Sequence, residues 1–90
     1  MDKIIVEKNP TQEKLEGLGV SSWPTWNCGI SEFDWTYDDT ETCYFLEGHV
    51  VVESQNQKVE VNKGDIAIFP KGLKCTWRVT EPVKKVYKFG

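Results

Sequence analysis

From Trp23 to its end, the chain alternates apolar and polar residues with a period of two, and turn signals interrupt it frequently. A period of two places alternate side chains on one face of a β-strand, so this region is predicted to be sheet. The expected strands lie near residues 30–37, 41–47, 49–54, 57–62, 65–69, 73–80 and 83–89. Seven short strands with closely spaced turns predict a closed barrel or a sandwich.

Three turns support this division of the chain. Residues 54–57 are polar and lie between two Val-rich segments, which is typical of a hairpin. Residues 62–65 and 70–72 combine Gly with Asn, Asp or Pro, the residues that favour tight turns. Neighbouring strands are therefore expected to pair in antiparallel fashion.

The first 20 residues carry different signals. Ile4–Val6 is predicted to be a short strand. A helix is expected to begin after Asn9, which can cap it, with Gln12 where a capping box places Glu or Gln. Gly17 or Gly19 is expected to end this helix, because glycine readily adopts the left-handed conformation of a helix stop. The predicted fold is thus an all-β antiparallel barrel with a short N-terminal helix.

Length and composition restrict the function classes. A chain of 90 residues has room for one hydrophobic core, so residues 1–90 are predicted to form a single domain. Four Trp, four Phe and three Tyr supply large side chains for that core. The net charge is −3 and the sequence has no basic patch of the kind that neutralises phosphates, so nucleic acid is not an expected partner. No segment is long and apolar enough to suggest a membrane partner.

The cysteines indicate the compartment. Cys28, Cys43 and Cys75 form no CxxC pair, and their odd number argues against a disulfide framework. Free cysteines are typical of a reducing compartment. Residues 1–8 mix charged and apolar side chains and lack the apolar core of a secretory signal. A cytoplasmic protein is therefore expected.

The strand at 41–47 is apolar on both faces. Cys43 and Phe45 share one face with Glu41, whereas Tyr44 and Leu46 point the other way. A sheet with one face in water alternates more cleanly. Either a second copy of the chain, which predicts a homodimer, or the N-terminal helix is expected to cover the outer face.

Two segments resemble the two halves of the cupin signature. Residues 41–48 (ETCYFLEG) end in Glu-Gly, and residues 64–75 (GDIAIFPKGLKC) run from Gly-Asp through a short apolar strand to Pro-x-Gly and a ligand position. Gly48 and Gly64 have a physical role as well, because glycine permits tight strand corners. The resemblance implies the cupin fold, an RmlC-like jelly-roll barrel.

More narrowly, nearly the whole chain resembles the small single-domain cupins grouped with the cupin domain of (S)-ureidoglycine aminohydrolases. This likeness is carried by residues 23–26 (WPTW), 33–37 (FDWTY), 41–44 (ETCY), Trp77 and 81–85 (EPVKK). Single-domain members of this group are often described without a known activity. The resemblance therefore implies a fold more than a function.

The positions that carry metal ligands in cupins differ in this chain. The family supplies two His before a Glu and one His after Pro-x-Gly. The early positions fall at Trp35 and Tyr37, or one residue earlier if the gap is longer, Glu41 is retained, and the late position holds Cys75. No metal or other cofactor is therefore expected. If a divalent metal binds, Tyr37, Glu41 and Cys75 are the candidate ligands, although a phenol with a pKa of about 10 is a poor ligand.

The barrel interior is expected to hold the site. The candidate pocket residues are Trp35, Tyr37, Glu41, Phe45, Cys75 and Trp77. Glu41 is the candidate catalytic residue, as a general base or a group that binds a substrate; alternatively it is a remnant acid satisfied by the Tyr37 hydroxyl. Cys75 is either a thiolate activated by nearby cations or an inert core residue. Lys84 and Lys85 are expected on a solvent-facing strand edge.

Three functions remain open on the sequence. The first is binding of a small molecule in a metal-free barrel, which the retained Glu41 beside lost histidines favours. The second is an enzyme of the ureidoglycine aminohydrolase type, acting on a small polar substrate. The third is a structural module with a packed barrel that acts as a homodimer.

Overall fold

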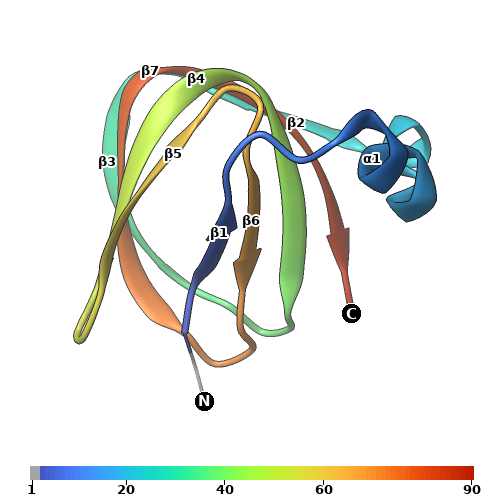
Figure 1. Ribbon diagram of the computed structural model, residues 1–90. Helices are drawn as coiled ribbons and strands as arrows, with labels where there is room; N and C mark the ends of the chain where they lie inside the picture. The colour runs from blue at the N-terminus through green and yellow to red at the C-terminus, as the bar shows by residue number, and fades with distance from the viewer. Residues whose placement is uncertain (1–2) are drawn as a thin grey trace.

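The computed structural model describes residues 3–90, so the first two residues of the predicted domain lie outside the described residues. One antiparallel sheet of seven strands curves into a jelly-roll barrel, and a short helix lies beside it (Figure 1). The elements in chain order are β1 (Ile5–Glu7), α1 (Gln12–Leu18), a 3-10 turn η1 (Val20–Ser22), β2 (Thr25–Cys28), β3 (Ser31–Thr36), β4 (Glu41–Ser54), β5 (Lys58–Asn62), β6 (Ile66–Phe69) and β7 (Lys74–Phe89). The predicted all-β barrel with a short N-terminal helix is confirmed.

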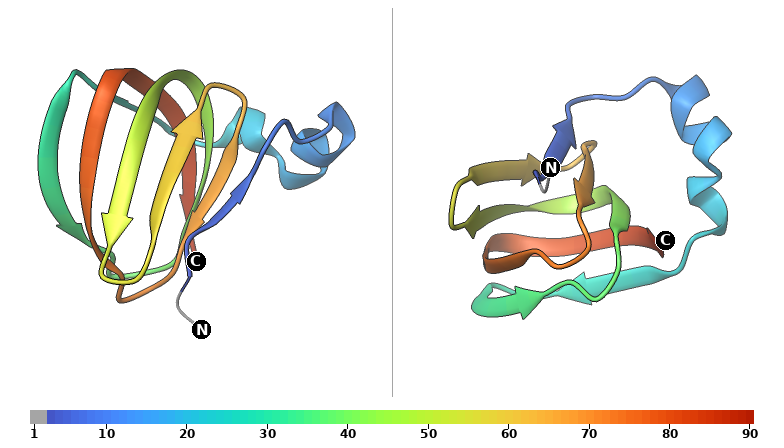
Figure 2. Two further views of the ribbon diagram at one scale, coloured as in Figure 1. Left: turned by 60° about the vertical axis from the view of Figure 1, so that its left-hand side comes forward. Right: turned by 90° about the horizontal axis from the view of Figure 1, so that it is seen from below.

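Two long strands form the centre of the sheet. β4 and β7 pair with each other from Glu41 opposite Phe89 to Ser54 opposite Cys75. The first half of β4 also pairs with β6 and its second half with β5, while β7 pairs with β3 and then with β2. β1 extends the sheet beyond β6. Since both central strands curve strongly, the two halves of the sheet face each other across the interior (Figure 2).

The bend in the central strands occurs where β4 passes β7 at Gly48. This residue has a φ of 98°, and a β-carbon added to it would lie 2.3 Å from the carbonyl oxygen of Pro82. The pairing register also shifts between Phe45 and Val50, which marks β-bulges at the same point. The expectation that Gly48 permits a tight corner is confirmed, and the corner needs both its left-handed φ and its missing side chain.

The predicted strand boundaries were wrong at this corner. Residues 41–47 and 49–54 belong to one bent strand, and the predicted strands at 73–80 and 83–89 are parts of another, which begins at Lys74. A bulge interrupts the alternation of side chains without ending the backbone pairing, so it resembles a strand end in the sequence. The strand β2 was also missed, because it is four residues long and begins directly after Pro24.

The bulges also decide which side chains of β4 point inward. Before the corner the buried residues are Glu41, Cys43 and Phe45, at odd positions. After it they are Val50 and Val52, at even positions. The register shift therefore keeps the apolar face inside on both halves of the strand. The prediction that Glu41 shares a face with Cys43 and Phe45 is confirmed.

The helix has a different start from the predicted one. Thr11 caps α1, and its hydroxyl accepts a hydrogen bond of 3.2 Å from the Lys14 amide. Asn9 instead lies outside the helix with a left-handed φ of 50°. Of the two glycines expected to end the helix, Gly19 does so, with a φ of 75°. Leu15 is buried and anchors the helix.

Aromatic rings fill the middle of the barrel. Trp77, Phe45 and Phe69 are almost completely buried. The centroid of Trp77 lies 6.3 Å from that of Phe45 and 5.6 Å from that of Phe69. Pairs at this separation add about 0.5–1.5 kcal/mol each beyond the burial of their area. These packed rings support the side chains at the open end of the barrel.

The outer face of the sheet is partly covered. Tyr44 and Leu46, which point outward from β4, are half-buried. A homodimer that would cover them further stays a prediction. Neither helix within residues 3–90 has the length and apolar character required to cross a bilayer.

Candidate functional site

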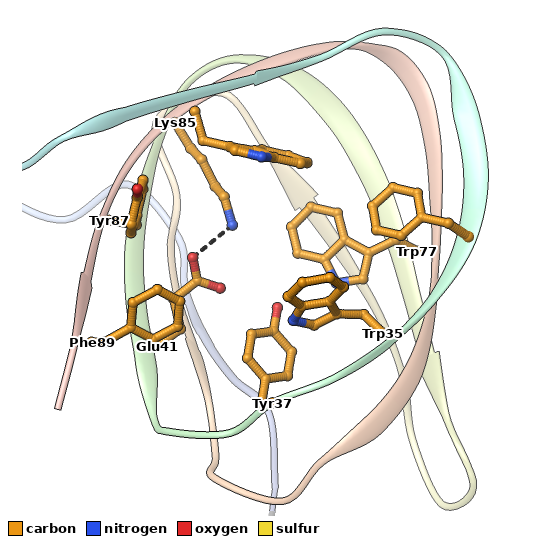
Figure 3. Close-up of a pocket in the computed structure, with 9 residues that line it drawn as sticks. Trp35, Tyr37, Glu41, Trp77, Lys85, Tyr87 and Phe89 are labelled. Carbon is orange, nitrogen blue, oxygen red and sulfur yellow. Dashed lines mark hydrogen bonds and ion pairs between the residues drawn. The ribbon is translucent and has the colours of Figure 1, made fainter.

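A cavity of about 250 Å³ lies at the open end of the barrel. Its walls come from strands far apart in the sequence, namely β2, β3, β4 and β7, together with the segment after β3 (Figure 3). The residues that line it are Trp26, Phe33, Trp35, Tyr37, Glu41, Trp77, Lys85, Tyr87 and Phe89. Aromatic rings thus surround one carboxylate and one ammonium group.

The charged pair of the cavity is Glu41 and Lys85. The Lys85 Nζ donates a hydrogen bond of 2.8 Å to Glu41 Oε2, and the two side chains are 6% and 5% exposed (Figure 3). Lys85 stands opposite Phe45 on β7, whereas Glu41 begins β4, so the lysine side chain extends along the interior to reach the carboxylate. Removing two such charges from water is expensive, and their mutual attraction offsets much of that cost.

Two indole rings hold the ammonium group as well. The Lys85 Nζ lies 4.6 Å from the ring centroid of Trp77 and 4.9 Å from that of Trp26. A cation within about 6 Å of an aromatic face is attracted by the ring quadrupole, and the attraction is stronger away from water. The Lys85 ammonium group therefore occupies a site formed by two aromatic side chains of the same protein.

Tyr37 lies on the other side of the carboxylate, with its hydroxyl pointing into the cavity (Figure 3). Its backbone is fixed by hydrogen bonds of 2.9 Å to the Leu73 carbonyl and 2.7 Å from the Gly72 amide, and its ring stacks on Phe69 at 5.1 Å. Burial, together with the negative charge of Glu41, raises the pKa of Tyr37 far above its ordinary value. The residue is therefore a neutral phenol that can donate or accept a hydrogen bond.

Trp35 stands at the mouth of the cavity. Its side chain is 51% exposed, and its ring meets that of Tyr37 edge to face at 6.5 Å. Further inside, the buried Nε1 of Trp77 has no hydrogen-bond partner among the described residues. A buried donor without a partner costs free energy.

Four of the six predicted pocket residues meet at this cavity: Trp35, Tyr37, Glu41 and Trp77. Two others do not line it. Phe45 is completely buried and stacks beneath Trp77. Cys75 points inward from β7, but its thiol lies against the Trp35 carbonyl at 3.7 Å rather than at the cavity wall.

The sequence prediction missed the most important residue of the site. Lys85 was expected on a solvent-facing edge with Lys84, yet it is 4% exposed inside the barrel. The signal was present in the alternation along β7, since Cys75, Trp77 and Lys85 all occupy odd positions and all point inward. The prediction was wrong because lysine is seldom buried without a partner, and the partner of Lys85 lies 44 residues away in the sequence. Four aromatic wall residues were also not assigned to the pocket: Trp26, Phe33, Tyr87 and Phe89.

The donor groups present do not fit a divalent cation. Among residues 3–90, no three His, Cys, Asp or Glu side chains gather closely enough to hold one. Of the candidate ligands, Glu41 is already bound by an ammonium group, which repels a metal ion. Tyr37 and Cys75 are kept protonated by burial, which raises the pKa of the Cys75 thiol to about 11. Metal ligands of these types must lose their protons.

The same burial predicts how the thiols react. Burial raises the pKa of Cys75 to about 11 and that of Cys43 to about 12, so no nearby cation activates Cys75. Because the thiolate is the reactive form, both stay inert in the folded protein. We expect Ellman's reagent at about pH 8 to titrate one thiol, the partly exposed Cys28, in native protein and three in denaturant. Rapid reaction of Cys75 without denaturant would contradict the interpretation of an inert core thiol.

The raised pKa of Cys75 also makes the stability of the protein depend on pH. Between the ordinary cysteine value of 9.0 and the value of about 11 for Cys75, the unfolded chain releases a proton that the folded chain retains. The Cys75 thiol therefore leaves the free energy of unfolding unchanged below about pH 9 and lowers it as the pH rises toward 11. Urea unfolding across this range measures the decline, and a Cys75→Ala variant is expected to show a shallower one.

An open-ended jelly-roll barrel with its site inside, built on Gly-Asp and Pro-x-Gly corners, defines a small cupin. Residues 15–87 match the model of the EutQ-like cupin domain family, and the chain belongs to that family. The narrower likeness to ureidoglycine aminohydrolases is not part of this match and stays a prediction.

Solved structures and a curated relative agree with this assignment. A DUF861 family protein from Thermotoga maritima is 49% identical, with a TM-score of 0.94 over 98% of this chain and 100% of that one. The EutQ protein of Clostridium difficile is 23% identical, with a TM-score of 0.69 over 98% of this chain and 68% of that one, a likeness of fold. The curated relative, named acetate kinase EutQ, from Clostridioides difficile (strain 630), is 29% identical over 71% of this chain. The match spans 44% of that relative's length.

Proposed function

We propose that this cupin binds a small organic molecule in the cavity at the open end of its barrel. The observation that carries the proposal is the buried pair of Lys85 and Glu41 at the wall of an aromatic cavity. A barrel that served only as packing would lose little with apolar residues at both positions, because a buried ion pair is often no better than well-packed apolar side chains. The presence of both charges beside an open space supports a binding role.

The size and polarity of the cavity indicate the kind of ligand. A volume of about 250 Å³ is just below the range of pockets for drug-sized molecules, so it suits a compound with about one ring. Indole faces favour a flat or apolar body. The Tyr37 hydroxyl, which points into the cavity, offers a hydrogen bond to an oxygen of the ligand. A small neutral or singly charged molecule with an oxygen acceptor matches these groups.

The name of the curated relative suggests one chemical class of ligand for the cavity. A protein named as an acetate kinase acts on a small carboxylate, and the match with this chain spans 44% of that relative. Among the residues that line the cavity, the Lys85 ammonium is the cation that a carboxylate would meet. Acetate and benzoate are therefore included among the probes below.

Binding is tested by titrating the protein with benzoate, benzyl alcohol and acetate, with tryptophan fluorescence and ¹H–¹⁵N NMR as readouts. At least one probe is expected to cause a saturable shift of the indole signals of Trp77 and Trp26. Trp35→Ala is expected to weaken that probe about three- to tenfold, since an aromatic contact is worth about 0.5–1.5 kcal/mol. Trp23→Ala removes an indole that does not line the cavity and is the matched control.

The proposal is wrong if none of the three probes, nor a library of one-ring compounds, shifts the cavity signals saturably. In that case the structural module becomes the better interpretation. Apolar side chains exposed in the described chain, including Ile5, Ile30 and Phe89, favour that second candidate. Light scattering in solution tests it, because a monomer at high concentration would remove its support.

A further inference from the structure

We propose that Lys85 is a carbonyl-reactive amine, whose Nζ condenses with a small aldehyde or ketone in the cavity to form a protonated imine. This inference rests on the proposed binding function, since the carbonyl compound must first occupy the cavity. It adds a covalent activity and assigns the ligand class as a one-ring carbonyl compound.

The position of Lys85 makes its amine selective. Its side chain is 6% exposed and lines the cavity, so a reagent in the cavity can reach Nζ. Lys84, its neighbour in sequence, points to the other side of β7 and does not line the cavity. A compound that fits between the aromatic walls is thus brought to one amine out of many. Holding the two reactants together raises the rate of condensation.

The groups around Nζ provide the necessary proton transfers. Glu41 Oε2, at 2.8 Å, takes a proton from the ammonium and leaves a neutral amine with a free electron pair. That pair attacks the carbonyl carbon and gives a carbinolamine, while the carbonyl oxygen gains a proton from Glu41. The second proton on nitrogen passes through Glu41 to the hydroxyl group, which leaves as water. Tyr37, a neutral phenol facing the same space, can hold the carbonyl oxygen during these steps.

The charges of the site suit the product as well as the reactant. An ammonium ion and an aldehyde give one protonated imine and one water, so a single positive charge remains on nitrogen. The faces of Trp77 and Trp26, at 4.6 and 4.9 Å, and the Glu41 carboxylate stabilise that charge before and after reaction.

The test uses the full chain, benzaldehyde as the probe and sodium cyanoborohydride as the reductant that fixes an imine as a secondary amine. Intact-mass spectrometry is expected to show one benzyl group per chain at low aldehyde concentration, and peptide mapping should place it on Lys85. Lys85→Met is expected to lose this fast single addition, whereas Lys84→Met retains it. Glu41→Gln keeps the amine but removes the proton acceptor, and is expected to slow labelling at least tenfold.

The mapping of wild-type protein decides the question even if Lys85→Met does not fold. Labelling spread over exposed lysines, with Lys85 unmodified, overturns the inference. Benzyl alcohol has nearly the same shape and no carbonyl group, so it separates the two proposals. If benzyl alcohol binds in the cavity but benzaldehyde does not label Lys85, the imine chemistry is wrong and binding stands; if neither enters, both are wrong.

Discussion

Replacement of Lys85 by Met is expected to lower the free energy of unfolding by about 3–5 kcal/mol, a large share of the total for a small domain. The cause is the carboxylate left behind rather than the lost contact itself. Glu41 is 5% exposed, and without the hydrogen bond from Nζ no other cation of the cavity wall compensates this buried acid. Urea unfolding at neutral pH measures the loss.

Two control variants separate this cause from general damage to the barrel. Lys84→Met changes the neighbouring lysine on the other side of β7 and is expected to alter stability by less than about 0.5 kcal/mol. The double variant Glu41→Met with Lys85→Met removes both charges at similar volume and is expected to recover most of the loss. A double variant as unstable as Lys85→Met alone would show that lost packing, not the unpaired carboxylate, dominates.

Gly48→Ala is expected to destabilise the protein by about 3–5 kcal/mol or to prevent folding. The added β-carbon would lie 2.3 Å from the Pro82 carbonyl oxygen and 2.7 Å from the Val83 Cα, both of them backbone atoms that cannot rotate away. The φ of 98° adds the strain of a left-handed conformation. Both central strands would have to separate at their corner, so the effect reaches the cavity through β7.

Gly72→Ala is the matched control for the conformational part of this effect. Gly72 also has a left-handed φ, 86°, but nothing lies within 4 Å of the position of its added β-carbon. It is expected to cost about 1–2 kcal/mol, the price of the backbone conformation alone. Equal losses in the two variants, measured by denaturant unfolding, would show that the contact with Pro82 is relieved by a small shift of the strands.

The sequence pattern was sufficient for the architecture. The period of two, the glycines of the corners and the resemblance to cupin motifs predicted an antiparallel barrel, which the structure and the family match confirm. These are local properties, because alternation and a left-handed φ depend on a residue and its immediate neighbours. Where pairing and alternation separate, as at the bulges near Gly48, the predicted strand ends were wrong.

Part of the candidate site could be predicted because the face on which a residue lies is also a local property. Glu41, Tyr37 and Trp77 occupy inward positions that a local pattern can assign, and they meet at the cavity. Phe45 also points inward, yet Trp77 separates it from the open end of the barrel. A strand pattern gives the face of a residue but not its depth in the barrel, so it could not distinguish a wall residue from a core residue.

By itself, the sequence determined that alternate residues of β4 and β7 would form the interior of one curved sheet. Only the tertiary structure decided that the Lys85 ammonium lies 2.8 Å from a carboxylate 44 positions earlier in the chain. A lysine can be buried when a partner compensates its charge, and that partner comes from another strand brought near by the curvature of the sheet. The chemistry of this cavity therefore follows from a contact that no local stretch of the chain contains.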